Sequence, residues 1–244
     1  MPRGWVGDWD GAAHAVLYAA AAGDMARVVV TRPVERSAAL AERLTERGHE
    51  VVVCSLVALE PMGPERIDTS GYDWAVVTSP TGAEELLRRA SPPLPRLAAI
   101  GPGTAAALRE VGAEPAVVAE VSTQEGLLAA FPPNPGRVLF AAAEDARPLL
   151  PDALGADVIT IYRTRRLRPA SFPSADLATL ASSSAAEALA ALEAGVPAAS
   201  IGPRTTETAE RLGIAVLAEA KTHDVDGLVD AVDTAVGRLR SRDR

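Results

Sequence analysis

Two similar turns in the sequence have residues suited to holding an anion. Ile100-Gly101-Pro102-Gly103-Thr104 has its counterpart in Ile201-Gly202-Pro203-Arg204-Thr205. The glycine of each turn lets a ligand approach the backbone, and the threonine can cap a helix or donate a hydrogen bond. Helix N-termini carry partial positive charge and unpaired N–H groups. Both turns are therefore candidates for binding an anionic substrate.

Two further pairs of turns follow the same order. Thr78, Ser79 and Thr81 correspond to the run Ser182-Ser183-Ser184, and the segment 123–127 corresponds to 224–228. For any one of these residues, an N-cap with no other role is the simpler explanation. Three ordered matches at a shift of about a hundred residues indicate a duplicated domain, because solenoid repeats are much shorter.

Tyr162 is the phenol in the most informative position. It ends a β-branched run, Val158–Ile161, and precedes an arginine-rich segment. A phenol there can act as a general acid or donate a hydrogen bond to a leaving oxygen. The alternative, a half-buried strand tyrosine, is equally compatible with the pattern. The nearby arginines are typical of a solvated connector.

Several catalytic classes are not supported by the residue spacing. His14, His49 and His223 share no metal-ligand spacing with the single cysteine, Cys54. There is no nucleophile elbow and no phosphate loop, and Gly101 begins no dinucleotide-binding fingerprint. We therefore expect no metal and no cofactor. We also expect Cys54 to be a buried strand thiol in a reducing compartment.

Composition restricts the partners. Hydrophobic residues make up 48% of the chain and aromatic residues 4%, so the predicted core is mainly Ala, Val and Leu. The formal net charge of −8 disfavours nucleic acid and anionic membranes. No apolar run is long enough to span a bilayer. We expect a cytoplasmic monomer that binds an anionic small molecule and neither nucleic acid nor membrane.

Alternating strand and helix patterns must position these turns. A strand at Val28–Val30, a helix from Val34 to Arg47 and a strand at Glu50–Cys54 predict parallel pairing through a crossover helix. The alternation continues to the C-terminus, apart from a connector predicted at Arg163–Ser174. The first two dozen residues are expected to form an irregular extension or a loose helix, and translation could begin at Met1 or Met25.

Taken together, these motifs resemble the uroporphyrinogen-III synthase family over Arg27 to Leu239. The resemblance rests on the order and spacing of seven short motifs: Val30–Pro33, Thr78-Ser79-Pro-x-Gly82, Ile100-Gly-Pro-x-Thr104, Ile161-Tyr-x-Thr164, Ser182–Ser184, Ile201-Gly-Pro-x-Thr205 and Asp226-Gly-Leu-Val.

The resemblance implies an α/β fold of two flavodoxin-like parallel-sheet domains joined by a two-stranded β-ladder. Domain 1 would be discontinuous, 26–57 plus 166–240, and domain 2 would be 60–161. Residues 1–25 would be a disordered N-terminal extension and 241–244 a tail. The ladder would pair Val53–Leu59 with Ile161–Arg168. Patterning alone would instead divide the chain into consecutive halves.

The resemblance also implies cyclisation of the linear tetrapyrrole hydroxymethylbilane, with inversion of ring D and loss of water, in a cleft between the domains. Tyr162 would be the proton donor for the leaving hydroxide. Because the substrate bears many carboxylates, hydroxyls and backbone N–H groups suit it, and catalysis would act mainly by positioning. The implied substrate-binding residues are Arg32, Thr78, Ser79, Thr81, Gly101, Thr104, Ser182, Ser183, Gly202 and Thr205.

The chain departs from the family pattern in two turns. Thr81 stands where the family often has Asn, and Ala141-Ala142-Ala143 replaces a turn that often contains Gly. Arg147 matches a frequent basic residue. Two alternatives remain open: a non-catalytic two-lobed binding or regulatory protein that kept the fold, and a domain of a larger fusion protein.

Overall fold

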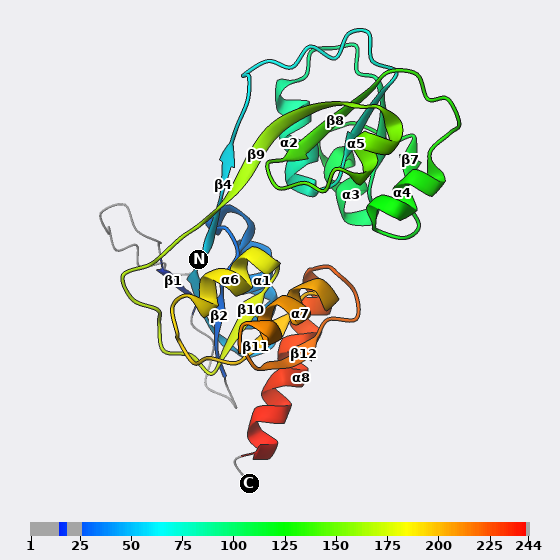
Figure 1. Cartoon of the computed structure of the whole chain (residues 1–244). Coiled ribbons are helices and arrows are strands. Elements are labelled where there is room, and N and C mark those ends of the chain that lie inside the picture. The colour runs from blue at the N-terminus through cyan, green and yellow to red at the C-terminus, as the bar shows by residue number, and fades with distance from the viewer. Residues whose placement is uncertain (1–14, 19–25, 243–244) are drawn as a thin grey trace. The chain divides into compact units, whose positions relative to one another are not determined.

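A computed structural model of the chain describes residues 15–18 and 26–242. The chain divides into two compact units (Figure 1). Unit 1 is Met1–Ala58 with Arg165–Arg244, and unit 2 is Leu59–Thr164. Each unit contains one six-stranded sheet. The expected fold class, α/β with parallel sheets, is confirmed.

Unit 1 is a doubly wound sheet with one added strand. Its strands lie in the order β1-β3-β2-β10-β11-β12. From β3 to β12 they are parallel, in the flavodoxin order 2-1-3-4-5. The elements are β1 (Ala15–Tyr18), β2 (Arg27–Val30), a 3₁₀ turn (Val34–Arg36), α1 (Ala38–Glu46), β3 (Glu50–Cys54), β10 (Leu177–Leu180), α6 (Ser183–Ala190), β11 (Ala198–Ser200), α7 (Pro203–Arg211), β12 (Val216–Glu219) and α8 (Val225–Arg242).

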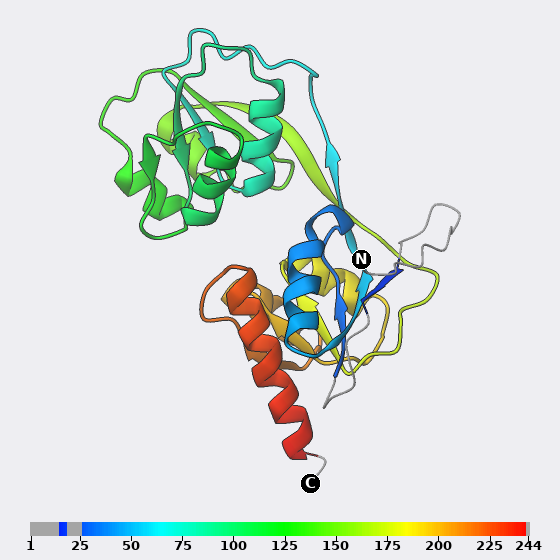
Figure 2. The same cartoon turned by 180° about the vertical axis from the view of Figure 1, so that it is seen from behind.

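Helices cover both faces of this sheet. The helices α6 and α7 pack on one face, and α1 and α8 pack on the other, as Figure 2 shows from behind. After Arg27, the central strand β2 is continuously hydrophobic because it is covered on both sides. Val28 and Val30 face α1 and α8, and Val29 faces α6. These small side chains allow close helix-on-sheet packing.

Strand β1 contradicts part of one expectation. The sequence predicted an irregular extension or loose helix for the first two dozen residues, yet Ala15–Tyr18 pair antiparallel with β3, Ala15 opposite Cys54. The run Ala-Val-Leu-Tyr contains strand-forming residues. It shows no alternation of apolar and polar residues, so the sequence pattern did not predict a strand there. Residues 1–14 and 19–25 lie outside the described residues, as does the end of the predicted tail.

Unit 2 is also doubly wound. Its sheet has the order β4-β9-β8-β5-β6-β7, in which β9 to β7 run parallel. The strand order reverses between β5 and β8. The elements are β4 (Val57–Pro61), β5 (Trp74–Val77), α2 (Pro80–Arg89), β6 (Arg96–Ala99), α3 (Pro102–Glu110), β7 (Val117–Val118), α4 (Gln124–Ala130), β8 (Val138–Ala143), α5 (Leu149–Leu154) and β9 (Asp157–Arg166).

The core of unit 2 has two layers. Side chains of α2 and α3 pack on the sheet face that carries Ala141 and Tyr162, and α4 and α5 pack on the other. The second layer contains the larger aromatic side chains. Phe140 is 1% exposed, and the rings of Trp74 and Phe131 lie 4.9 Å apart. Elsewhere Ala, Val and Leu dominate both cores, as composition predicted.

Both crossings of the chain from one unit to the other lie in neighbouring strands, β4 and β9. Backbone hydrogen bonds from Met62 to Ile161 and from Leu167 to Leu56 bracket this antiparallel pair. The expected ladder began too early, because Val53 still belongs to β3. The predicted connector at Arg163–Ser174 was also wrong in its first part, since β9 continues to Arg166.

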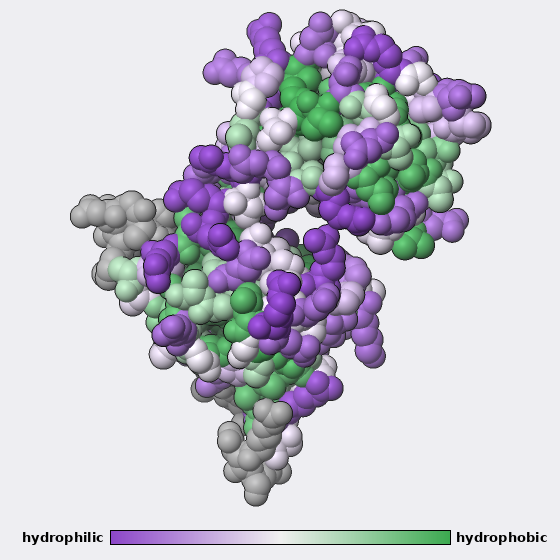
Figure 3. Space-filling model, in the orientation of Figure 1, coloured by the Kyte–Doolittle hydropathy of each residue, from purple (hydrophilic) through white to green (hydrophobic). Residues whose placement is uncertain are grey.

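Within the described residues, no helix has both the length and the apolar character needed to cross a bilayer. Hydrophilic and hydrophobic residues are mixed on the face of each unit seen in Figure 3.

Candidate active site

The predicted site residues lie at the carboxyl ends of parallel strands, the edge where doubly wound sheets bind ligands. In unit 2, most of them follow β5 and β6. Tyr162 lies within β9, where it pairs with Ala143 at the end of β8. In unit 1 they follow β2, β10 and β11. The unit 2 group is Thr78, Ser79, Thr81, Gly101, Thr104 and Tyr162, and the unit 1 group is Arg32, Ser182, Ser183, Gly202 and Thr205.

Ser79 and Tyr162 form a direct pair. The Ser79 Oγ lies 2.9 Å from the Tyr162 hydroxyl oxygen. Ser79 is also the N-cap of α2, where its Oγ accepts a hydrogen bond from the Gly82 N–H at 2.9 Å. Tyr162 is 8% exposed. A buried phenol is thus held by a hydroxyl that itself lies at a helix N-terminus.

Small residues on β8 and α2 leave space for the Tyr162 ring between β9 and Ser79. β8 lies between β9 and β5, so the ring must pass over β8 to reach Ser79. Ala141 of β8 belongs to the same core layer as Tyr162. A methyl group added at Gly82 would lie 3.9 Å from Tyr162 Cε1 and 3.1 Å from Ser79 Oγ. The segment Ala141-Ala142-Ala143, which we expected to be a turn that often contains Gly, belongs to strand β8, and its small side chain at Ala141 packs in the layer of the ring.

Ser79 and Ser182 are matched N-caps. Ser182 caps α6 by accepting from the Ala185 N–H at 3.2 Å, and its backbone is extended like that of Ser79. The neighbouring Ser183 hydroxyl contacts α7, accepting from Thr208 Oγ1 at 3.2 Å. Thr78 and Thr81 are half-buried on either side of the Ser79-Pro80 step.

These caps predict unequal costs of substitution. Ser182→Ala should lower the free energy of unfolding by about 1 kcal/mol, the usual value of a lost N-cap. Ser79→Ala should lower it by about 1 kcal/mol more, because the buried Tyr162 hydroxyl also loses a partner. Urea unfolding of both variants measures the difference. Equal losses would contradict the contribution of the Ser79–Tyr162 bond.

The two Gly-Pro turns are packed against the protein's own loops. A methyl group at Gly101 would lie 2.1 Å from Ser122 Oγ, and one at Gly202 would lie 2.9 Å from the His223 ring. We expected these glycines to let a ligand approach the backbone. Instead, the loop before α4 lies against Gly101, and the loop before α8 lies against Gly202. Gly101 and Gly202 are themselves the N-caps of α3 and α7, without side-chain caps.

Thr104 and Thr205 lie in the first turns of α3 and α7. Both are buried, 3% and 5% exposed, so they contribute to packing at these turns. The two Gly-Pro turns belong to different units. That they face each other across a cleft stays a prediction.

Arg32 differs from most arginines of the chain. It follows the carboxyl end of the central strand β2 in unit 1 and is half-buried. Burial lowers the pKa of its guanidinium, and the nearby Arg36 lowers it further. No carboxylate pairs with Arg32 among the residues that the structure describes. A partly desolvated cation of this kind attracts an anionic ligand. By contrast, Arg147 pairs with Glu125 at 2.6 Å on the surface.

Glu85 on α2 pairs with two arginines. Burial opposes ionisation of Glu85, but hydrogen bonds from Arg88 and Arg89 outweigh it and lower the pKa of this carboxyl below 4.5. A lowered folded-state pKa stabilises the protein above the unfolded value, and this contribution is lost as pH falls through the folded value.

The free energy of unfolding of the wild type should therefore fall relative to Glu85→Gln as pH drops below about 4.5, because only the wild type loses an ionised Glu85. Denaturant titrations of both proteins between pH 7 and pH 3 measure this difference. Parallel pH profiles would contradict it.

Cys54, the single cysteine considered in the sequence, is not a catalytic group in this structure. Cys54 is buried, and burial raises the pKa of its thiol to about 11, so it is protonated at neutral pH. This confirms a buried strand thiol.

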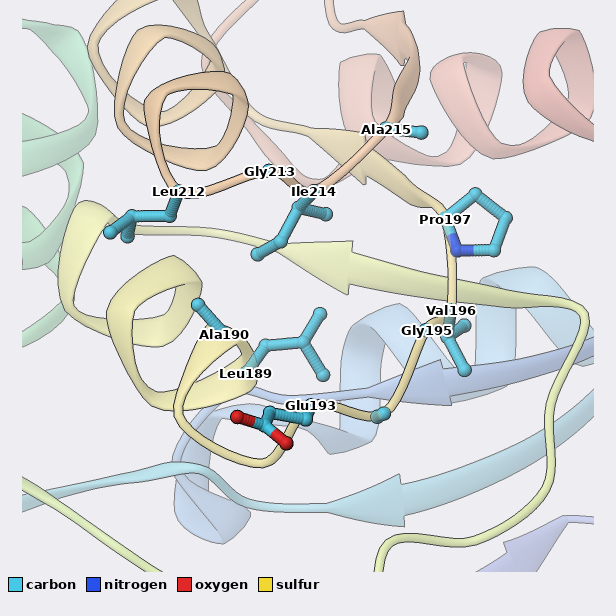
Figure 4. Close-up of a pocket in the computed structure, with 11 residues that line it drawn as sticks. Leu189, Ala190, Glu193, Gly195, Val196, Pro197, Leu212, Gly213, Ile214 and Ala215 are labelled. Atoms are coloured by element: carbon cyan, nitrogen blue, oxygen red, sulfur yellow. The ribbon is translucent and has the colours of Figure 1, made fainter.

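The groove of about 370 Å³ in Figure 4 is lined by Leu189, Pro197, Leu212 and their neighbours. It lies where β11 and β12 begin, at the opposite edge from the predicted site.

Comparison with known proteins identifies the family. A family model described as Uroporphyrinogen-III synthase HemD matches residues 38–230, which is more than half of the chain. The chain belongs to the uroporphyrinogen-III synthase family. The matched range covers every predicted site residue except Arg32. Proteins of this family are cyclising lyases.

Similar proteins agree with this family. A Methanocaldococcus jannaschii protein named "Putative uroporphyrinogen-III synthase" is 26% identical over 148 residues, which are 57% of this chain and 62% of that protein. The match thus spans less than two thirds of the curated relative. The fold is similar to uroporphyrinogen-III synthetase of Helicobacter pylori, with a TM-score of 0.60 and 16% identity. That match covers 86% of this chain and 99% of the other.

A mutant uroporphyrinogen III synthase from the bacterium Thermus thermophilus has a similar fold, with a TM-score of 0.56 and 18% identity over 87% of this chain and 99% of the other. At these identities the two structures support the fold, and the family assignment rests on the sequence match.

Proposed function

We propose that the chain is an active uroporphyrinogen-III synthase that cyclises hydroxymethylbilane with inversion of ring D and loss of water. The observation that carries the proposal is the Ser79–Tyr162 pair at the carboxyl edge of the unit 2 sheet. The reaction needs a proton donor beside a leaving hydroxyl, and a buried, oriented phenol suits that need.

In the proposed chemistry, the C–O bond of the substrate hydroxymethyl group breaks and the leaving oxygen takes the Tyr162 proton to form water. Ser79 accepts from the Gly82 N–H and donates to the phenol oxygen, which stabilises the phenolate as it forms. The azafulvenium cation then closes onto ring D through a spiro intermediate. The proton released in closure returns to the phenolate.

The remaining residues would bind the substrate carboxylates. The partly desolvated guanidinium of Arg32 and the hydroxyls at the N-termini of α2 and α6 are the groups best suited to anions. This assignment uses the carboxyl edges of both sheets and treats the two units as the two domains of the enzyme. We further propose that the enzyme works in the cytoplasm as a monomer, without a cofactor.

The isomer assay tests the proposal. Purified protein supplied with hydroxymethylbilane should yield the type III uroporphyrinogen, whereas uncatalysed closure yields type I. The products, oxidised to porphyrins, are separated by chromatography. Only type I product from folded protein would overturn the activity and would favour a binding protein that retained the fold.

A further inference from the structure

The guanidinium of Arg89 lies at the C-terminal end of α2 and is almost fully buried. Its side chain is 2% exposed, whereas that of the adjacent Arg88 is 58% exposed. A buried charge is costly unless it is paired and hydrogen-bonded. Arg89 meets this requirement by pairing with Glu85, one helical turn earlier. Arg88 pairs with the same carboxylate from the surface.

What distinguishes Arg89 is a set of backbone acceptors. Its Nη1 donates to the carbonyl oxygens of Met62 and, at 3.4 Å, Pro64, and its Nη2 donates to Ile161 O at 2.7 Å. Ile161 O also accepts from the Met62 N–H. One side chain thus joins α2 to β9 and to the segment that follows β4.

Ile161 O belongs to the same planar peptide unit as the Tyr162 N–H. Fixing this carbonyl therefore fixes the orientation of the peptide from which Tyr162 extends. At the other end of α2, Ser79 holds the Tyr162 hydroxyl. The ten residues of α2 span about 15 Å, so two adjacent residues of β9, Ile161 and Tyr162, are held from opposite ends of this helix.

We propose that Arg89 is a positioning residue for Tyr162: it holds the Ile161–Tyr162 peptide so that the phenol meets Ser79 in its reactive orientation. The consequence for turnover rests on the proposed synthase activity, whereas the effect on the position of Tyr162 does not. Arg89 touches no substrate in this account and acts only through β9.

Two variants and one control separate positioning from simple stabilisation. Arg89→Met removes every contact of the guanidinium, while Glu85 keeps Arg88 as a partner. Arg89→Lys keeps a charge for Glu85, but one ammonium cannot replace the planar fork that reaches three carbonyls. Arg88→Met is the matched control, since it removes the exposed partner of Glu85 and no backbone contact.

The first readout is the position of the phenol. The chain has three tyrosines, so 3-fluorotyrosine labelling gives three fluorine resonances, and Tyr162→Phe identifies that of Tyr162. We expect this resonance to shift in Arg89→Met and in Arg89→Lys and to stay in place in Arg88→Met. The second readout is kinetic: Arg89→Met should lower kcat by about tenfold while KM changes by less than about twofold.

Thermal unfolding shows which variants are folded. A folded Arg89→Met with an unmoved Tyr162 resonance, or a shift of equal size in Arg88→Met, would overturn the proposal. If Arg89→Met does not fold, the resonance and kcat of Arg89→Lys decide instead. The fluorine spectra need no substrate, so an inactive wild type would overturn the proposed function while leaving this test intact.

Discussion

Tyr162→Phe should lower kcat for type III uroporphyrinogen formation by about 100-fold, the lower range for loss of a positioned general acid. The phenyl ring still fills its place in the core, where Tyr162 is 8% exposed, so the change removes the hydroxyl, with its bond to Ser79, and leaves no cavity. The free energy of unfolding should fall by about 1 kcal/mol. Steady-state kinetics and urea unfolding on the same preparation measure both quantities.

Tyr72→Phe is the matched control. The Tyr72 hydroxyl donates to Asp157 Oδ2 at 2.9 Å at the start of β9, away from the predicted site. Its removal deletes a tyrosine hydroxyl bond in the same unit and should leave kcat unchanged within about twofold. An unchanged kcat in Tyr162→Phe would exclude the proton-donor role, although the family assignment would stand.

Gly101→Ala should lower the free energy of unfolding by about 2 to 3 kcal/mol, the upper range for overpacking. The backbone φ of 174° is extended and suits any residue, so the cost comes from contact alone. The new methyl group would lie 2.1 Å from Ser122 Oγ and 2.9 Å from Ser122 Cβ. The loop before α4 must move to relieve the clash. Denaturant unfolding measures the loss.

Gly103 supplies the control two residues later. A methyl group there meets no atom within 4 Å, so Gly103→Ala should stabilise α3 by about 0.5 to 1 kcal/mol through helix propensity. Ser122→Gly in the Gly101→Ala background should recover most of the lost stability, because the nearest remaining atom, Ser122 Cα, lies at 3.5 Å. Similar stabilities for the two alanine variants would show that the contact does not limit this turn.

Much of the fold could be predicted because its signals are local. Strand and helix alternate in the sequence with turn residues between them, and the repeated Ser and Thr turns became N-caps with closely matched backbone angles. The Gly-Pro turns were correctly placed before helices. Their chemical interpretation was less accurate, since Ser122 and His223 fill the space that we expected a ligand to use.

The remaining features depend on residues far apart in the chain. The bond between Ser79 and Tyr162 joins positions 83 residues apart, and no periodicity encodes which strand lies beside which. Arg89 was missed for the same reason: an arginine at the end of an amphipathic helix is usually solvated, and only the fold brings backbone carbonyls to it. The antiparallel strand β1 lacked the crossover helix that identified the parallel strands.

The interrupted course of unit 1 determines when each part of the molecule can fold during synthesis. Strand β2 leaves the ribosome early, yet its neighbour β10 is translated only after the whole of unit 2. Domains usually fold in the order in which they are made. Here unit 2 is completely translated before unit 1. Until β10 is made, the edge of β2 that will pair with β10 stays unpaired. An unpaired strand edge of this kind favours aggregation.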